Sequence, residues 1–125
     1  MHDQATTLFE AIERGDEETT TSEAILAEVA FVLASPRQYN LPAADVAAYL
    51  AALIRLPGLK LPRGQKRRYL RALDIWAATP KLGFVDALTV ALVESTTIEL
   101  ATFDTDFDAI PRIIRRQPLP GRATP

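Results

Sequence analysis

The stretch IELATFDTDFD, residues 98–108, decides the fold class of this chain. Its first six residues are mostly apolar or β-branched and predict a buried strand. Asp104, Asp106 and Asp108 follow that strand directly. In open α/β sheets, ligand sites gather at the carboxyl ends of the strands. The stretch therefore predicts a buried strand with a polar site at its end.

Helical and extended segments alternate along the rest of the chain. Apolar spacing predicts helices over residues 6–14, 23–33, 41–54, 63–78 and 85–94. Short extended segments are predicted at residues 19–22, 59–61, 98–103 and 113–114. Such alternation implies parallel strands joined by helical crossovers, which is the α/β class. The chain opens on a helix, whereas a doubly wound domain usually opens on a hydrophobic strand. Either the first strand is missing or the sheet is assembled differently.

Length and composition indicate one globular domain. The 125 residues suffice for a single core, which we place in residues 1–117, with a tail rich in proline and small residues at 118–125. The chain has no cysteine, which excludes disulfides and thiolate metal sites. Neither a secretion leader nor a bilayer-spanning apolar run is visible. We therefore expect a cytoplasmic protein that does not enter a membrane.

The basic residues are unevenly distributed although the net charge is only −2. Seven of the 14 lysines and arginines lie between Arg55 and Arg71. A polyanion could dock on such a surface. Arg67, Arg68 and Arg71 are therefore candidates for holding a phosphate backbone. Salt bridges or solvated helix faces explain the same residues equally well.

Glu28 and Asp86 each stand in an apolar setting. A partly buried carboxylate is costly unless it is paired, hydrogen-bonded or bound to a metal. Glu28 interrupts an apolar helix, where a salt bridge to an arginine or partial exposure is the alternative explanation. Asp86 lies at the entrance of the helix predicted at residues 85–94. There it could instead be an ordinary N-cap.

Asp104 and Asp106 complete the candidate site. Clustered aspartates repel one another unless a cation neutralises them, although a simple polar turn is also possible. Together with Glu28 and Asp86 they could converge on one hard cation, since Mg²⁺ and Mn²⁺ favour oxygen ligands. Such a centre can activate a water and offset charge on a phosphodiester.

Other catalytic schemes find little support. There is no cysteine nucleophile, and the single histidine, His2, stands at the terminus, so a serine–histidine triad is not expected. No phosphate-binding glycine loop or dinucleotide fingerprint is present. Trp76, Tyr49 and Tyr69 are more simply core or boundary residues than base-stacking platforms.

Three segments resemble the PIN-domain family, specifically its VapC-type toxins. SEAILAEV at residues 22–29 is similar to the segment carrying the family's second acid, which maps onto Glu28. FVDAL at residues 84–88, followed by Ala91, resembles the segment with the third acid, Asp86. TFDTDF at residues 102–107 is similar to the closing motif, with Asp104 as the fourth acid and Asp106 beside it.

The resemblance implies a three-layer α/β/α domain with a central parallel sheet. It also implies hydrolysis of RNA at an acidic pocket, with Glu28, Asp86 and Asp104 as ligands of Mg²⁺ or Mn²⁺ and Asp106 in support. Members of this family commonly form homodimers and are inhibited by a small antitoxin protein.

The chain departs from the family at its start. The family opens with a strand ending in an aspartate, and no hydrophobic run precedes Asp3 here. Three accounts are open: a misassigned start, a sheet closed by its flanking strands or by another chain, or a degenerate member. Two functions follow. One is a metal-dependent endoribonuclease, the toxin of a toxin–antitoxin pair; the other is a non-catalytic module that binds an antitoxin or a second copy.

Overall fold

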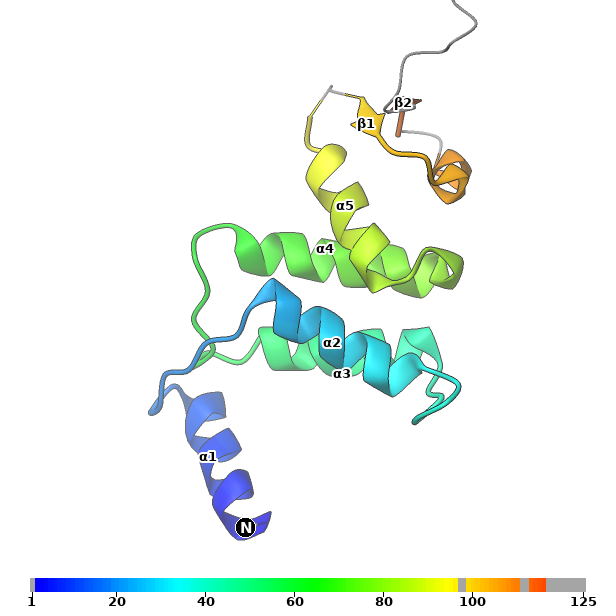
Figure 1. The fold of residues 1–125 in the computed structure, drawn as a ribbon. Coiled ribbons are helices and arrows are strands. Elements are labelled where there is room, and N and C mark those ends of the chain that lie inside the picture. Colours follow the sequence, from blue (N-terminus) through cyan, green and yellow to red (C-terminus); the bar gives the residue numbers. More distant parts are fainter. Residues whose placement is uncertain (1, 97–98, 111–112, 117–125) are drawn as a thin grey trace, which may run out of the picture.

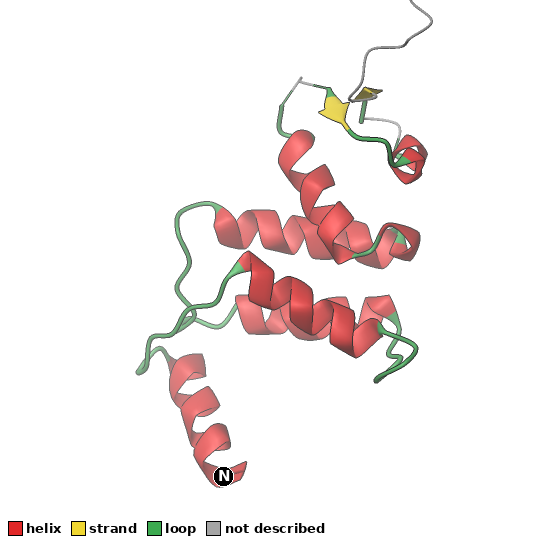
Figure 2. Ribbon diagram, in the orientation of Figure 1, coloured by secondary structure: helices red, strands yellow, loops and turns green. Residues whose placement is uncertain are grey.

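A computed structural model describes residues 2–96, 99–110 and 113–116 of the chain. The protein is mostly helical (Figures 1 and 2). Its α-helices are α1 (His2–Arg14), α2 (Glu23–Ala34), α3 (Ala43–Ile54), α4 (Gln65–Ala78) and α5 (Phe84–Val93). Two 3₁₀ helices, η1 (Pro80–Leu82) and η2 (Thr105–Ala109), and two short strands, β1 (Leu100–Ala101) and β2 (Arg115–Arg116), complete the described elements.

Helices α2 to α5 build the hydrophobic core around α4. Helix α4 packs against α3 on one side and against α5 on the other, while α2 contacts both α3 and α5. The largest fully buried side chains come from all four helices: Leu26, Val46, Ile54, Leu73 and Val90. The rings of Trp76 and Phe84, 5.8 Å apart and tilted, join the end of α4 to the start of α5. This aromatic contact fixes where α5 begins, and thereby the position of its first turn.

The strands are parallel, as the helix–strand alternation predicts. Leu100 pairs with Arg115 in the β1–β2 ladder, and Thr19 forms an isolated parallel bridge to Leu59. These pairings fall in three of the four predicted extended segments, whereas β2 lies just after the fourth, which was predicted at residues 113–114. In Figure 1 the ladder lies beyond the end of α5, whereas the bridging loops lie at the side of the molecule where α1 joins the other helices. Within the described residues the pairings do not join into one sheet, so the three-layer arrangement stays a prediction.

The apolar stripes of α2 and α3 are only partly buried. On α2, Leu26 and Ala30 are buried, whereas Ile25 and Val29 are 53% and 37% exposed. On α3, Tyr49 is 65% exposed although it falls on the apolar stripe. The physical reason on α2 is that small alanines let the neighbouring helices approach, so the larger β-branched residues are left on the outer side.

Helix α1 meets the rest of the protein through its carboxyl-terminal end. Ile12 is buried there, and its carbonyl accepts a 2.8 Å hydrogen bond from the Gly58 amide. Leu8 and Phe9, which stand at helical spacing from Ile12, are about half exposed. Among the described residues, no helix is both long and apolar enough to cross a bilayer. The predicted tail at 118–125 lies outside the described residues, and cytoplasmic location stays a prediction.

Candidate active site

Asp86 lies in the first turn of α5 and is half-buried. The N-cap of this helix is Gly83, with a φ of 78° that favours glycine. The alternative that Asp86 is itself the N-cap is therefore wrong. Its carboxylate still benefits from the positive end of the helix. No side-chain hydrogen bond or ion pair joins Asp86 to another described residue, so its carboxylate is available to a ligand.

The segment after β1 is held in shape by its own side chains. The Thr102 hydroxyl accepts a 3.1 Å hydrogen bond from the Asp104 amide, and the Asp104 carboxylate accepts one of 2.9 Å from the Asp106 amide. Asp104 is thus the N-cap of η2. Arg115 donates to the Thr102 carbonyl and pairs with Asp108 at 2.9 Å. These contacts fix the direction in which the acidic segment leaves the strand.

The electrostatics of Asp86 show that the two acidic segments are neighbours. The pKa of Asp86 is raised above its ordinary value, first because partial burial desolvates the carboxylate and then because Asp104 and Asp106 repel its charge. Residues almost 20 positions apart in sequence therefore share one electrostatic environment. The raised pKa means that the Asp86 carboxyl holds a proton more tightly than a fully exposed aspartate does.

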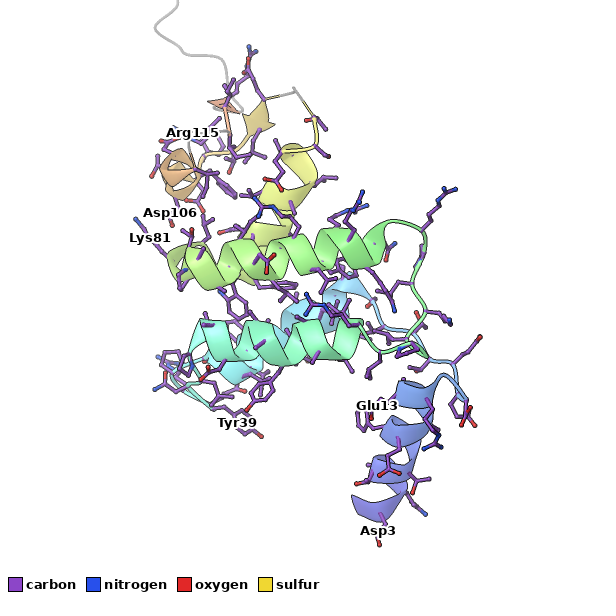
Figure 3. The ribbon with its side chains drawn as sticks, turned by 180° about the vertical axis from the view of Figure 1, so that it is seen from behind. Asp3, Glu13, Tyr39, Lys81, Asp106 and Arg115 are labelled. Atoms are coloured by element: carbon purple, nitrogen blue, oxygen red, sulfur yellow. The ribbon has the colours of Figure 1, made fainter. Side chains whose placement is uncertain are left out.

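Lys81, which the sequence analysis did not single out, supplies one positive charge to this cluster. Its ammonium lies 3.6 Å from the Asp106 carboxylate, and the two residues are adjacent in Figure 3. Lys81 belongs to η1, directly before Gly83 and α5. Pro80 and Gly83 indicate a turn in this part of the sequence. They do not indicate that Lys81 pairs with Asp106.

Glu28 stands apart from the other predicted ligands in its environment. It is exposed on α2 and is not among the carboxylates that raise the pKa of Asp86. It forms no ion pair with a described residue, so the expected salt bridge is not seen and partial exposure explains it. Within the described ranges, no three acidic or histidine side chains are close enough to share a metal ion. A common pocket for Glu28, Asp86 and Asp104 stays a prediction.

A hollow of about 530 Å³ opens beside Asp86. It lies between the end of α2, the start of α3, and the η1–α5 junction, and its walls are almost entirely apolar. Its aromatic lining residues are Phe31, Trp76 and Phe84, and Asp86 is its one charged residue. A ligand that reaches Asp86 from this side therefore meets apolar surface first.

The three predicted substrate-binding arginines differ in their contacts. Arg71 donates two hydrogen bonds, of 2.6 and 3.2 Å, to the Glu94 carboxylate. The salt-bridge explanation therefore holds for Arg71. The Arg67 and Arg68 side chains make no hydrogen bond or ion pair with any residue that the structure describes. Of these three arginines, Arg67 and Arg68 are therefore the two that no described carboxylate engages.

The parallel strand pairings, the helices between them and the acidic segment after β1 are those of an α/β domain. The chain matches the PIN domain family over residues 1–113 and belongs to that family. PIN domains have an α/β fold, are generally nucleases, and typically depend on a divalent metal. No curated protein and no solved structure matches the chain.

Proposed function

We propose that this protein is a metal-dependent endoribonuclease of the VapC type, the toxin of a toxin–antitoxin pair. The observation that carries the proposal is the raised pKa of Asp86 beside Asp104 and Asp106, in a chain of the PIN domain family. Perturbed carboxylates next to a hollow are typical of functional sites.

The donor chemistry of the acidic site fits Mg²⁺ or Mn²⁺. Asp86, Asp104 and Asp106 offer only oxygen ligands, which these cations prefer, and the mutual repulsion of the carboxylates falls when a cation binds between them. In the described structure these three carboxylates are not close enough together for all of them to bind one ion. The proposal therefore includes a small closure of η2 toward α5 on binding, with Glu28 available from α2. When bound, the cation would supply an acidified water and neutralise phosphate charge.

The chain's own residues have distinct parts in this proposal. Asp86, half-buried in the first turn of α5, would hold the cation and thereby orient the attacking water. Lys81 lies where it can offset charge on the phosphate or on Asp106. Thr102 keeps Asp104 oriented through the hydrogen bond to its amide.

The test is RNA cleavage by the full chain in the presence of Mg²⁺ or Mn²⁺. We expect cleavage that stops on chelation and is lost in Asp86→Asn with the fold intact. Asp74→Asn is the matched control, because Asp74 is an exposed aspartate of α4 outside the site. Wild-type protein that leaves RNA uncut with either metal, or an Asp86→Asn variant as active as the control, contradicts the proposal.

A second candidate function is a non-catalytic module that binds an antitoxin or a second copy of the chain. Large apolar side chains are exposed around the predicted ligands: Ile25 and Phe31 on the helix of Glu28, and Val85 directly before Asp86. Exposed apolar surface of this kind is typical of protein interfaces. Sedimentation of the full chain separates the cases, since a homodimer with no cleavage supports the second candidate alone.

A further inference from the structure

A second hollow, of about 590 Å³, lies at the opposite end of α5 from the acidic site. It is lined by the start of α4 (Gly64, Arg67, Arg68, Arg71) and the end of α5 (Ala91, Glu94, Ser95). Glu94 is the one acidic residue in this lining, and it is engaged by Arg71 at 2.6 Å. Arg67 and Arg68 therefore have no carboxylate partner among the residues that line the hollow.

The surroundings of this hollow do not neutralise that charge. Residues 55–71 contain seven basic residues and no acidic one. Lys66 turns away and donates to the Leu56 carbonyl at 3.1 Å. The guanidinium groups of Arg67 and Arg68 meet no carboxylate among the described residues. Cations held this close together repel one another, so an anion in the hollow lowers the electrostatic free energy of the folded protein.

We propose that the hollow formed by Arg67, Arg68 and the end of α5 binds the phosphate backbone of a single-stranded RNA. Guanidinium groups suit phosphate, because their planar N–H donors can bind two oxygens at once. Arg71 is a positioning residue, since its pairing with Glu94 holds α4 and α5 together at the edge of the hollow. The choice of RNA rests on the proposed function.

The helix between the two sites sets their separation. Glu94 lies eight positions after Asp86, which corresponds to about 12 Å along an α-helix. A stacked strand advances by about 3.4 Å per nucleotide, so this length of α5 corresponds to about four nucleotides. We infer that RNA must extend this far on one side of the reacting bond to gain from the arginines.

Fluorescence anisotropy with labelled RNA of about 12 nucleotides, in a chelator that removes divalent metal, tests the binding site without requiring cleavage. Replacing both Arg67 and Arg68 by alanine should weaken RNA binding by about tenfold or more. The slope of the logarithm of the binding constant against the logarithm of the salt concentration should fall in magnitude by about 1.4, because each lost phosphate contact to a single strand removes about 0.7. The control Arg37→Ala removes an exposed arginine from the α2–α3 turn and should leave binding within about twofold. The double lysine variant should restore most of the affinity.

The outcomes separate this inference from the proposed function. Arginine-dependent RNA binding by a protein that cuts no RNA supports the inference and overturns the nuclease. Cleavage with RNA binding unchanged in the double alanine variant overturns the inference alone. Equal binding of a polyglutamate peptide or of phosphatidylserine vesicles, lost in the same variant, would also overturn it, because the hollow would then serve another class of partner. With an active enzyme, the double alanine variant should raise KM for the long RNA.

Discussion

The charge of Asp104, the N-cap of η2, raises the pKa of Asp86, in the first turn of α5. Desolvation of Asp86 is the larger cause of that shift, and Asp106 contributes after Asp104. Helix α5 and the segment after β1 thus bring like charges together where ordinary packing would separate them. Repulsion between neighbouring carboxylates is typical of functional sites and uncommon in parts of a protein that only stabilise the fold.

Replacing the charge of Asp86 should stabilise the metal-free protein. A carboxyl whose folded pKa is raised above its unfolded value holds its proton more tightly when folded, so ionising it costs stability as the pH rises through that range. At pH 7 we expect Asp86→Asn to raise Tm by about 2 to 5 °C. The gain should shrink as the pH falls and disappear below the unfolded pKa, where both forms are neutral. Thermal unfolding followed by circular dichroism from pH 3 to 8 checks this; a variant less stable than wild type at pH 7 contradicts it.

Divalent metal should make the wild type more stable than Asp86→Asn. If Mn²⁺ binds with a Kd of about 1 mM, adding about 10 mM stabilises the folded protein by about 1.4 kcal/mol. Asp86→Asn should lose most of this stabilisation, whereas Asp74→Asn should keep it. Glu28→Gln decides whether α2 takes part, because a reduced Mn²⁺ effect in this variant brings Glu28 into the site. Equal stabilisation of all four proteins would mean that the cation binds elsewhere.

The helices could be predicted from sequence because their signals are local. Apolar periodicity and breaks such as Ser35–Pro36 locate α2 to α5 to within a few residues of their observed bounds. Periodicity does not say which face meets a neighbour, however. On α2 the other helices pack against Ala30, which is buried, and this leaves the larger side chains of Ile25 and Val29 exposed.

The candidate site was predictable only in part. Topology alone places the end of β1 near the start of a neighbouring helix, so the meeting of Asp86 and Asp104 follows from a general rule. The pairing of Lys81 with Asp106 depends on the exact turn of η1, which has no sequence signature. The position of Glu28 depends on long-range packing of α2, and the pattern around it gave no measure of its exposure.

The Arg71–Glu94 pair should contribute measurably to the joining of α4 and α5. The two hydrogen bonds are bidentate, and the Glu94 side chain is only 16% exposed against 44% for Arg71. We expect Arg71→Ala to lower the free energy of unfolding by about 1 kcal/mol, because a half-buried carboxylate loses its main donor. A double-mutant cycle with Glu94→Gln should give a coupling of about 0.5 to 1 kcal/mol. Urea unfolding measures both, and a coupling near zero would show that the pair is loosely held in solution.

Gly58 should be essential for attaching α1. A Cβ at this position would lie 2.2 Å from the Glu17 carbonyl oxygen and 2.6 Å from that of Ile12, both of them backbone atoms that cannot move aside alone. Gly58→Ala should therefore push α1 away and break the 2.8 Å hydrogen bond from the Gly58 amide to Ile12. Overpacking of this kind costs about 1 to 3 kcal/mol. Since α1 has few other contacts with the rest of the protein, we expect the loss of stability to be largest in α1.

Hydrogen exchange followed by mass spectrometry can locate the effect of Gly58→Ala. Amides of residues 8–17 should exchange faster, while those of α4 and α5 keep their protection, because the core around Leu73 does not involve Gly58. Gly64→Ala is the matched control: a Cβ there meets no atom within 4 Å, yet the φ of 85° makes the substitution strained. It should lower overall stability without selectively exposing α1. If both variants exchange alike, α1 is not attached through the contact at Gly58.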